Sequence, residues 1–152
     1  MLRLRPHHII DIVRNIGNNR PLTPHPYGHL VHKITQKILD DVKQDCRLVI
    51  DNDDICGPCI KLDKYNRCTD ILPQLETPVS KQEYNDELDR RILDHLKIEE
   101  GSILKIDDFL RMIAGDMDKM VNICTHPKED PEYRRNGLLK GLKILGITMT
   151  GQ

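Results

Sequence analysis

Residues 53–68 read DDICGPCIKLDKYNRC, and this stretch holds three of the five cysteines of the chain, Cys56, Cys59 and Cys68. Gly57 and Pro58 favour turns at this point over a regular helix or strand. A CxxC pair with a third thiol nearby, in a polar segment, is typical of a metal or redox site. The stretch therefore predicts an irregular cysteine lobe, around which the rest of the fold is arranged.

The remainder of the sequence has the composition of packed helices. Of 152 residues, 38% are hydrophobic but only 3% are aromatic, with one Phe and no Trp. The core must then be made of Ile, Leu, Val and Met, and the chain is long enough for one domain with its own core. We expect a single, mainly α domain over residues 1–152, with about five helices, the cysteine lobe and one or two short strands.

Apolar periodicity and helix-end residues place the expected helices. Pro6 suits the first turn of one helix, Ser80 and Glu83 form a capping box ahead of another, and Asp107 is the expected cap of a fourth. The short run 47–51 is the best strand candidate and leads into the cysteine lobe. The expected helices cover about 6–16, 28–43, 81–96, 107–124 and 131–145.

Charge and hydropathy exclude several classes of function. The formal net charge is -1 with 31% charged residues, which argues against a basic surface for nucleic acid. No stretch is apolar over the roughly 18 residues that a membrane span needs, and the start of the chain has no signal-peptide core. We therefore expect a cytoplasmic protein that binds neither nucleic acid nor membrane. Thiols stay reduced there, so clustered cysteines are more often ligands or catalysts than disulfides.

A metal site needs a fourth ligand beyond the three clustered thiols. Cys124 lies far away in sequence at an expected helix end, and is the best candidate. Four thiolates suit a [4Fe-4S] cluster, and they suit a closed tetrahedral zinc site equally well. Cys46 stands alone and is expected to pack in the core, although a site that uses Cys46 in place of Cys124 stays open. Four unrelated buried cysteines are the plainest alternative.

The tetrapeptide CGPC is also found at the active site of thioredoxin-like proteins. In those proteins the first thiolate is activated at a helix N-terminus within a βαβ fold. Here the residues after Cys59, IKLDKYNRCTD, are poor helix formers, and the segment before the strand candidate is predicted to be helical. Dithiol exchange between Cys56 and Cys59 is therefore an alternative to metal binding, and the less favoured one.

His7 and His8 open the first expected helix and are the candidate catalytic residues. An uncapped helix N-terminus keeps neighbouring imidazoles neutral, and therefore able to bind a metal or accept a proton. Adjacent side chains diverge by about 100° on a helix, so we expect one ring to face the site and the other to pack or cap. Two ordinary surface histidines are the alternative.

A second histidine group consists of His25, Tyr27, His29 and His32. His29 and His32 are three residues apart and share a helix face, a spacing that suits a metal pair or an acid–base pair. An ordinary amphipathic helix start would account for them as well. His126 is a further candidate for a group that supports the metal site. His25, Tyr27, His29 and His126 are thus expected to support the metal or to contact substrate.

Acidic residues near these groups are expected to be solvated. Asp51, Asp53 and Asp54 precede the cysteines. Carboxylates at this place could orient ligating groups, and a solvated loop is the favoured account. Residues 83–91 mix acids and bases in the pattern of an exposed helix face with i, i+4 ion pairs. His95, on the same helix, is expected to face solvent.

Two motifs of the chain resemble one small prokaryotic family, whose members open with RPHH and carry a DDIC-x-PC loop followed by a further Cys. The resemblance spans about the first half of the chain. That family is described as predicted to bind an iron–sulfur cluster and has no established activity, so the resemblance implies a cluster and names no substrate. The matching residues are Arg5, Pro6, His7, His8, Asp53, Asp54, Ile55, Cys56, Pro58, Cys59 and Cys68.

The chain departs from this pattern at one place. Family members often have a Cys soon after the two histidines, where this chain has Asp11 or, in a tighter alignment, Ile10. The resemblance then implies a fourth thiolate from elsewhere, most simply Cys124, or a cluster with three thiolates and a non-thiolate or open fourth position.

The leading hypothesis is a cytoplasmic [4Fe-4S] protein with Cys56, Cys59, Cys68 and Cys124 as ligands. If the cluster faces a substrate, His7 and His8 would line the cleft and the protein would be an enzyme. The alternative from another class is a structural zinc module for protein interaction, and the second alternative is a CGPC dithiol–disulfide oxidoreductase. The sequence names neither the small-molecule substrate nor a redox partner.

Overall fold

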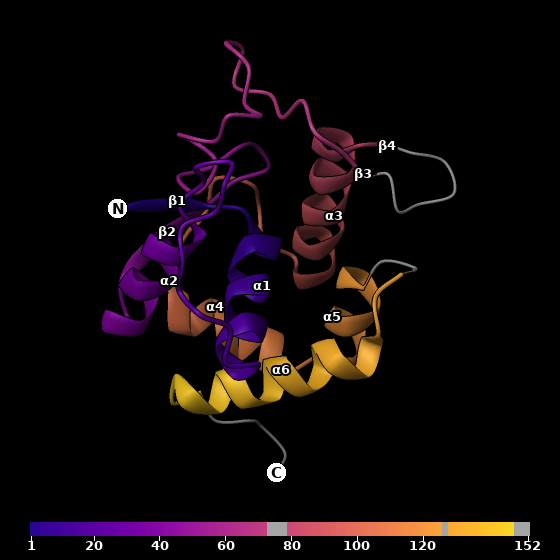
Figure 1. Cartoon of the computed structure of the whole chain (residues 1–152). Helices are drawn as coiled ribbons and strands as arrows, with labels where there is room; N and C mark the ends of the chain where they lie inside the picture. The colour runs from indigo at the N-terminus through magenta and orange to yellow at the C-terminus, as the bar shows by residue number, and fades with distance from the viewer. Residues whose placement is uncertain (73–78, 126–127, 148–152) are drawn as a thin grey trace.

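A computed structural model describes residues 1–72, 79–125 and 128–147 of the chain (Figure 1). Within these ranges six helices dominate and the strands are short, so the fold is mainly α as expected. The elements are β1 (Leu2–Leu4), α1 (Pro6–Gly17), α2 (Val31–Asp40), β2 (Asp45–Leu48), β3 (Ile71–Leu72), β4 (Val79–Ser80), α3 (Lys81–Leu96), β5 (Ile103–Lys105), α4 (Ile106–Ala114), α5 (Met117–Cys124) and α6 (Pro131–Ile144).

A three-stranded sheet of order β1-β2-β5 positions the start of α1 beside the cysteine lobe. β1 and β2 are parallel, with Leu2 opposite Cys46 and Leu4 opposite Leu48, whereas β5 pairs antiparallel with β2. The chain leaves parallel strands at the same edge of a sheet. Because α1 follows β1 and the cysteine lobe follows β2, the two segments meet at that edge. β3 and β4 form a separate antiparallel pair.

Helix α1 lies at the centre of the molecule, between α3 and α6 (Figure 1). Its apolar residues Ile9, Ile10, Ile12 and Val13 are at most 1% exposed. Leu138 and Leu142 of α6 and Ile92 and Leu93 of α3 belong to the same core cluster. The core is thus built from aliphatic side chains, as the low aromatic content requires.

Glycines let α1 and α6 approach each other closely. A Cβ atom on Gly17 would overlap the backbone of Gly137, and one on Gly141 would overlap the carbonyl oxygen of Val13. Only glycine fits where two backbones are this close. The glycines of α6 therefore determine how near the two helices lie.

Most of the expected helices agree with the structure. The boundaries of α3 are the predicted ones, and α1 and α6 differ from prediction by one residue at one end. Helix α2 is shorter, because residues 28–30 and 41–43 lie outside it.

Three details of the prediction are wrong. The single helix predicted over 107–124 is broken at Gly115 and Asp116 into α4 and α5. Lys105, with extended backbone, is the N-terminal cap of α4, and Asp107 lies in its first turn, where it pairs with Arg111. The strand predicted at 47–51 instead spans Asp45–Leu48, because pairing with both β1 and β5 is confined to those residues.

No helix in the described part of the chain is both long enough and apolar enough to cross a membrane.

Candidate metal centre

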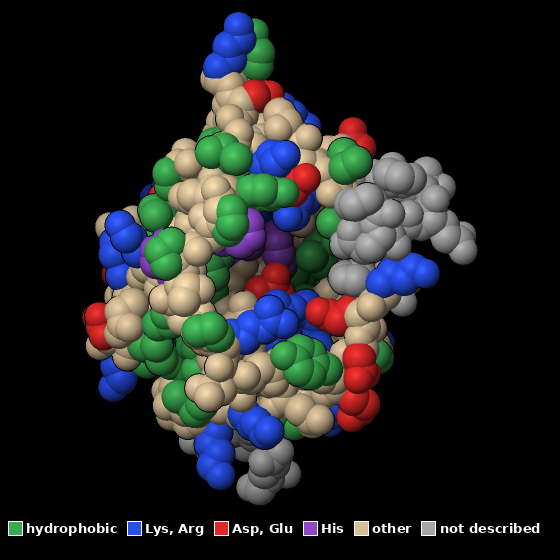
Figure 2. Space-filling view, in the orientation of Figure 1, with side chains coloured by type: hydrophobic (Ala, Val, Ile, Leu, Met, Phe, Trp, Pro, Cys, Tyr) green, Lys and Arg blue, Asp and Glu red, His purple; other side chains and the backbone are tan. Residues whose placement is uncertain are grey.

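One cavity of about 440 Å³ brings together most of the predicted site residues. Figure 2 shows its mouth as a hollow in the middle of one face, with histidine side chains inside and charged side chains at the rim. His126 lies outside the described residues, and His25 does not line this cavity. The predicted residues that line it are His7, His8, Tyr27, His29, Cys56, Cys59, Cys68 and Cys124.

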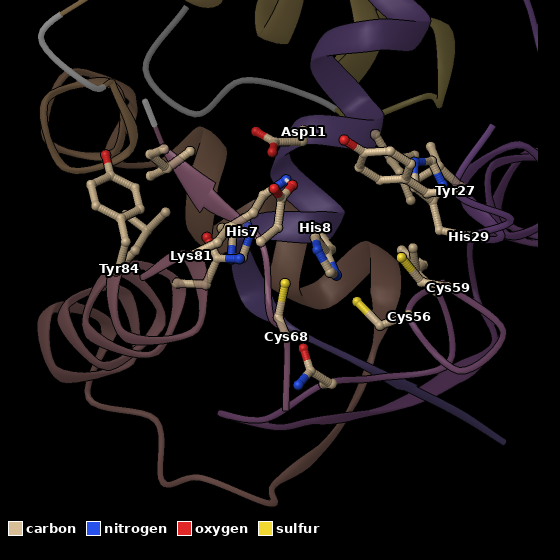
Figure 3. Close-up of a pocket in the computed structure, with 18 of the residues that line it drawn as sticks. His7, His8, Asp11, Tyr27, His29, Cys56, Cys59, Cys68, Lys81 and Tyr84 are labelled. Atoms are coloured by element: carbon tan, nitrogen blue, oxygen red, sulfur yellow. Dashed lines mark ion pairs between the residues drawn. The ribbon is translucent and has the colours of Figure 1, made fainter. Parts of the chain in front are cut away.

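Consecutive turns direct Cys56 and Cys59 toward the cavity (Figure 3). The amide of Cys56 donates to the Asp53 carbonyl at 3.0 Å, and the amide of Cys59 donates to the Cys56 carbonyl at 2.9 Å. The amide of Ile60 then donates to the Tyr27 carbonyl at 2.7 Å, which ties the lobe to the segment before α2. Residues 54–58 form turns, and no helix follows the CGPC sequence within the described residues of the lobe.

Cys68 is returned to the same cavity by two contacts. Leu62 and Cys68 form an antiparallel bridge, which folds the intervening residues into a loop. The Cys68 amide donates to Oε1 of Gln82 at 2.8 Å, and Gln82 in α3 is 1% exposed. The position of the third thiol therefore depends on a helix that begins thirteen residues later in the chain.

Asp53 anchors the start of α1 to the cysteine lobe. Its Oδ2 accepts from the Arg5 amide at 2.7 Å and from His8 Nδ1 at 2.7 Å, and its Oδ1 accepts from the Ile55 amide at 3.0 Å. The residue is 4% exposed, so the expectation that it is solvated is wrong. Because a carboxylate only accepts, His8 Nδ1 carries a proton and its Nε2 is left for other partners.

Asp89 of α3 holds His7 in the same way that Asp53 holds His8. It accepts from the His7 amide at 2.8 Å, from His7 Nδ1 at 2.9 Å and from Nη1 of Arg5 at 2.9 Å. Asp89 and Arg5 are both 0% exposed, so this part of α3 is not the exposed charged face predicted for it. The second guanidinium nitrogen of Arg5 reaches Asp86 at 2.8 Å.

Both imidazoles therefore belong to the site, and the prediction that one of them faces away is wrong. The ring centroids of His7 and His8 are 4.4 Å apart, and both rings line the cavity. They lie in the first turn of α1, where side chains tilt toward the helix N-terminus, and each is held by a carboxylate from a different segment. In Figure 3 the Cys68 thiol points toward this pair, and Cys56 lies beside His8.

The pKa of His8 reflects two opposing influences, burial and the neighbouring Asp53 carboxylate. Burial alone would lower the pKa of His8, but the Asp53 carboxylate outweighs it and raises the pKa. Burial would likewise raise the pKa of Asp53, but His8 and the amides that it accepts from lower it. The helix N-terminus lowers the pKa of a nearby histidine because it disfavours a cation. The Asp53 carboxylate, hydrogen-bonded to His8 at 2.7 Å, has the larger effect on this pKa.

One group of three ligand atoms within the described residues is compact enough for a metal ion. His8, Asp53 and Cys56 each offer an atom within 4.8 Å of the other two. Both oxygens of Asp53 already accept from the protein. Asp53 therefore suits the role of a carboxylate that orients a histidine ligand, and His8 and Cys56 suit the role of ligands.

Cys124 lines the cavity from another side. It is 4% exposed at the end of α5, and burial raises its pKa to about 12. The charges that act on it most strongly are Arg134 and Asp11, whereas those acting on Cys56 are Asp53 and Arg5. Cys124 thus lies near the ion pair of Asp11 and Arg134, which joins α1 to α6. Its role as the fourth ligand stays a prediction.

The comparisons with known proteins give one match. A family model described as a protein of unknown function, DUF1284, matches residues 26–128. The chain belongs to this family. The match contains all five cysteines and the carboxylates Asp53 and Asp89, and it begins after α1. No curated protein and no solved structure matches the chain.

The residues of the second histidine group are divided between two cavities. Tyr27 lines the thiol cavity and His32 lines a second cavity, while His29 lines both. The rings of His25 and His29 stack with centroids 4.2 Å apart. Burial and the neighbouring His25 lower the pKa of His29 to about 4, so its ring is neutral at physiological pH.

Among the residues that position the histidines, the sequence indicated an orienting role for Asp53 only as the less favoured alternative to a solvated loop, and it indicated no such role for Arg5 and Asp89. The two aspartates were assigned to solvent because their neighbours in sequence are charged. Only for Asp53 does the local sequence indicate a role at the site, because Asp53 lies just before the cysteines. Asp89 lies 82 residues from His7, and no local pattern links them.

Proposed function

We propose that the protein is an iron–sulfur protein whose cluster, of the [4Fe-4S] type, is bound by Cys56, Cys59, Cys68 and His8. The observation that supports this most is the shared cavity of three thiols and an imidazole whose Nδ1 is held by Asp53. Thiolates are the ligands of such clusters, and a histidine can replace a thiolate in them. The donor set of this cavity therefore fits the group.

The spacing of the thiols favours a cluster over a single zinc ion. Zinc–sulfur bonds of about 2.3 Å in a tetrahedron place two sulfur atoms about 3.8 Å apart. Cys56, Cys59 and Cys68 do not form a group within 4.8 Å of one another in the described chain. A cluster distributes its ligands over several metal atoms, so it accepts a wider spacing than one ion does.

His8 is favoured over Cys124 as the fourth ligand because of its neighbours. One ring nitrogen of His8 lies within 4.8 Å of the Cys56 sulfur. The hydrogen bond from Nδ1 to Asp53 leaves Nε2 without that partner and available to a metal. The charges that act on Cys124 are those of Arg134, Asp11, Asp89 and Glu129 instead. The carboxylate behind the imidazole is also the usual support of a metal-bound histidine.

His7 suits a proton-transfer role in the same cavity. Asp89 fixes its Nδ1, as the buried carboxylate of a catalytic histidine does, so Nε2 can accept or donate a proton. A cavity of this size falls in the range of about 300–1,000 Å³ typical of small-molecule sites. A bound cluster would supply electron transfer or Lewis acidity, while His7 would move a proton on a small substrate. This function requires a reducing compartment such as the cytosol.

The dithiol alternative receives less support from the structure. A reactive CxxC thiol has a lowered pKa, usually from a helix N-terminus. Here the CGPC residues lie in turns, and burial together with Asp53 raises the pKa of Cys56 to about 12. Cys56 is therefore a poor nucleophile unless a metal displaces its proton.

Anaerobic purification followed by metal analysis and a visible spectrum tests the proposal. We expect a brown protein with broad visible absorption, four irons and four sulfides per chain. Colourless protein with one zinc per chain, unchanged by anaerobic handling, would contradict it and support the structural zinc module.

Two substitutions then assign the fourth ligand. His8→Ala should lose or convert the cluster, whereas Cys124→Ser should retain it, since Cys124 lies at the end of α5, where the charges of Arg134 and Asp11 act on it. Loss in Cys124→Ser with retention in His8→Ala would reverse the assignment. His7→Ala should retain iron, because His7 is assigned to proton transfer and not to ligation.

A further inference from the structure

A second cavity of about 570 Å³ lies beside the thiol cavity and is not explained by metal binding. It is formed by the end of α1, the segment from 19 to 29, α2 and the end of α6. Asn15, His29 and Val31 line both cavities, so a molecule in the second one lies one side chain away from the first.

The second cavity has basic and neutral polar side chains but, among the described residues that line it, no acidic one. This is unusual in a chain with 24 Asp and Glu residues. The arginines of the thiol cavity, Arg14 and Arg134, are both paired with Glu129. Arg20, in contrast, lines the second cavity and has no ion pair with any described residue. Its charge is therefore available for an anion.

Two buried imidazole nitrogens nearby also lack a partner. Nδ1 of His29 and Nδ1 of His32 are both buried, and neither has a hydrogen-bond partner among the described residues. Buried polar atoms without partners are rare in native proteins because they are destabilising. A polar group of a bound ligand would satisfy these nitrogens, and water would do so when the cavity holds no ligand. This is a second observation, independent of Arg20, that indicates a ligand.

The rest of the lining is apolar. Ile16 and Val31 are partly buried against the core, whereas Leu22, Leu39 and Ile144 are 42%, 37% and 60% exposed. Three exposed aliphatic side chains around one cavity are a place for the apolar body of a ligand. The site is thus amphipathic, with the Arg20 guanidinium as a permanent positive charge.

We propose that the second cavity binds a small monocarboxylic acid with an apolar body. The carboxylate pairs with the Arg20 guanidinium, a charge-assisted interaction that arginine makes with two parallel hydrogen bonds. The apolar body lies against Leu22, Leu39 and Ile144. Because His29 separates the two cavities, the bound acid is next to the thiols. The proposal concerns ligand binding alone and stands whether or not the centre holds iron.

The test is isothermal titration calorimetry of the full chain with octanoate, 1-octanol and acetate. Octanoate has both features, octanol lacks the charge, and acetate lacks the apolar body. We expect octanoate to bind at least about tenfold more tightly than either of the others. Equal affinity for octanol would contradict the role of Arg20, and equal affinity for acetate would contradict the apolar site. Iron content is measured separately, so either proposal can fail alone.

Two variants locate the binding. Arg20→Ala should weaken octanoate binding about tenfold and leave octanol binding unchanged. Arg91→Ala, at an exposed arginine on α3, is the matched control and should change neither. Leu22→Glu adds a carboxylate to a half-exposed position and should weaken octanoate more than Leu22→Gln does. Unchanged octanoate affinity in both Arg20→Ala and Leu22→Glu would overturn the proposal.

Histidine ring signals in nuclear magnetic resonance give a readout that does not depend on affinity. Octanoate should shift the ring signals of His29 and His32 in wild-type protein. His95, which pairs with Asp116 and does not line the second cavity, is the internal control. Shifts at His95 without shifts at His29 and His32 would place the acid elsewhere and contradict the proposal.

Discussion

The two ends of helix α1 are built in opposite ways. At its start lie three polar side chains, the buried Arg5 and His7 and the partly buried His8, and each is held by an aspartate from another segment. At its other end, Val13 and Gly17 meet Gly137 and Gly141 of α6 backbone against backbone, with the Asn18 side chain beside Gly137. The first end depends on matched charges and the second on the absence of side chains. Substitutions at the two ends should therefore destabilise the protein for different reasons.

Arg5→Met should have the largest effect on stability. It leaves Asp89 buried without its cation, and breaking a buried ion pair in this way costs about 3–5 kcal/mol. Denaturant unfolding measures the loss. Arg3→Met is the matched control, because Arg3 lies two residues earlier with an exposed side chain and should change the free energy of unfolding very little. Similar losses in both variants would show that the Arg5–Asp89 pair is not what holds this end.

Gly141→Ala probes the opposite end of α1. The added methyl group would overlap the Val13 carbonyl, and overpacking of this kind costs about 3 kcal/mol when backbone has to move. Lys140→Ala, one residue earlier on an exposed face of α6, should change stability by less than about 0.5 kcal/mol. If Gly141→Ala left the free energy of unfolding unchanged, α1 and α6 could move apart without loss of stability.

Acid should weaken the middle of α1, where Asp11 faces Arg14 and Arg134. Burial would raise the pKa of Asp11, but the two guanidinium groups outweigh it and lower the pKa from 3.8 to about 2. A lowered folded-state pKa stabilises the protein above the unfolded value, and this contribution disappears as pH falls through about 2. The contribution at neutral pH is about 2 kcal/mol at most.

Unfolding of wild type and Asp11→Asn at several pH values measures this contribution. The two proteins should differ at pH 7 and converge as the pH falls from about 4 toward 2, the range between the unfolded and folded pKa values of Asp11. A difference that stays constant over this window would show that the carboxylate charge of Asp11 does not stabilise the fold.

Cys46→Ala should have the smallest effect and should leave the site intact. Cys46 is 1% exposed in the core, and burial raises its pKa to about 12, as befits a packing residue. Removal of one buried sulfur should cost about 1 kcal/mol. Metal content should match wild type, in contrast to Cys56→Ala. Loss of metal in Cys46→Ala would make Cys46 the remote ligand.

The sequence predicted those parts of the molecule that depend on neighbouring residues. The capping box of Ser80 and Glu83 located the start of α3, and the CxxC spacing placed Cys56 and Cys59 in one turn. The break between α4 and α5 was missed, because the apolar periodicity continues across Gly115. Strand β1 was missed because three residues are too few to show a pattern.

The parts that were not predicted depend on contacts between distant residues. His7 and His8 were expected to diverge because helix geometry alone was considered, whereas Asp89 and Asp53 draw both rings to one side. Asp89 was assigned to solvent because the mean polarity of α3 is high. Its burial follows from Arg5, 84 residues earlier in the chain, which no local pattern indicates.

The packing of α1 against α6 has a consequence for the order of folding. Asp11 and Arg134, which join these helices, are 123 residues apart, and the contacts between Arg5 and Asp89 span 84 residues. Contacts this distant are slow to form because a long loop must close first. During synthesis the cysteine segment leaves the ribosome before α3 and well before α6. Its thiols would therefore be exposed to solvent at first. Because Gln82 of α3 holds the Cys68 amide, loading of the site with metal would have to wait for α3.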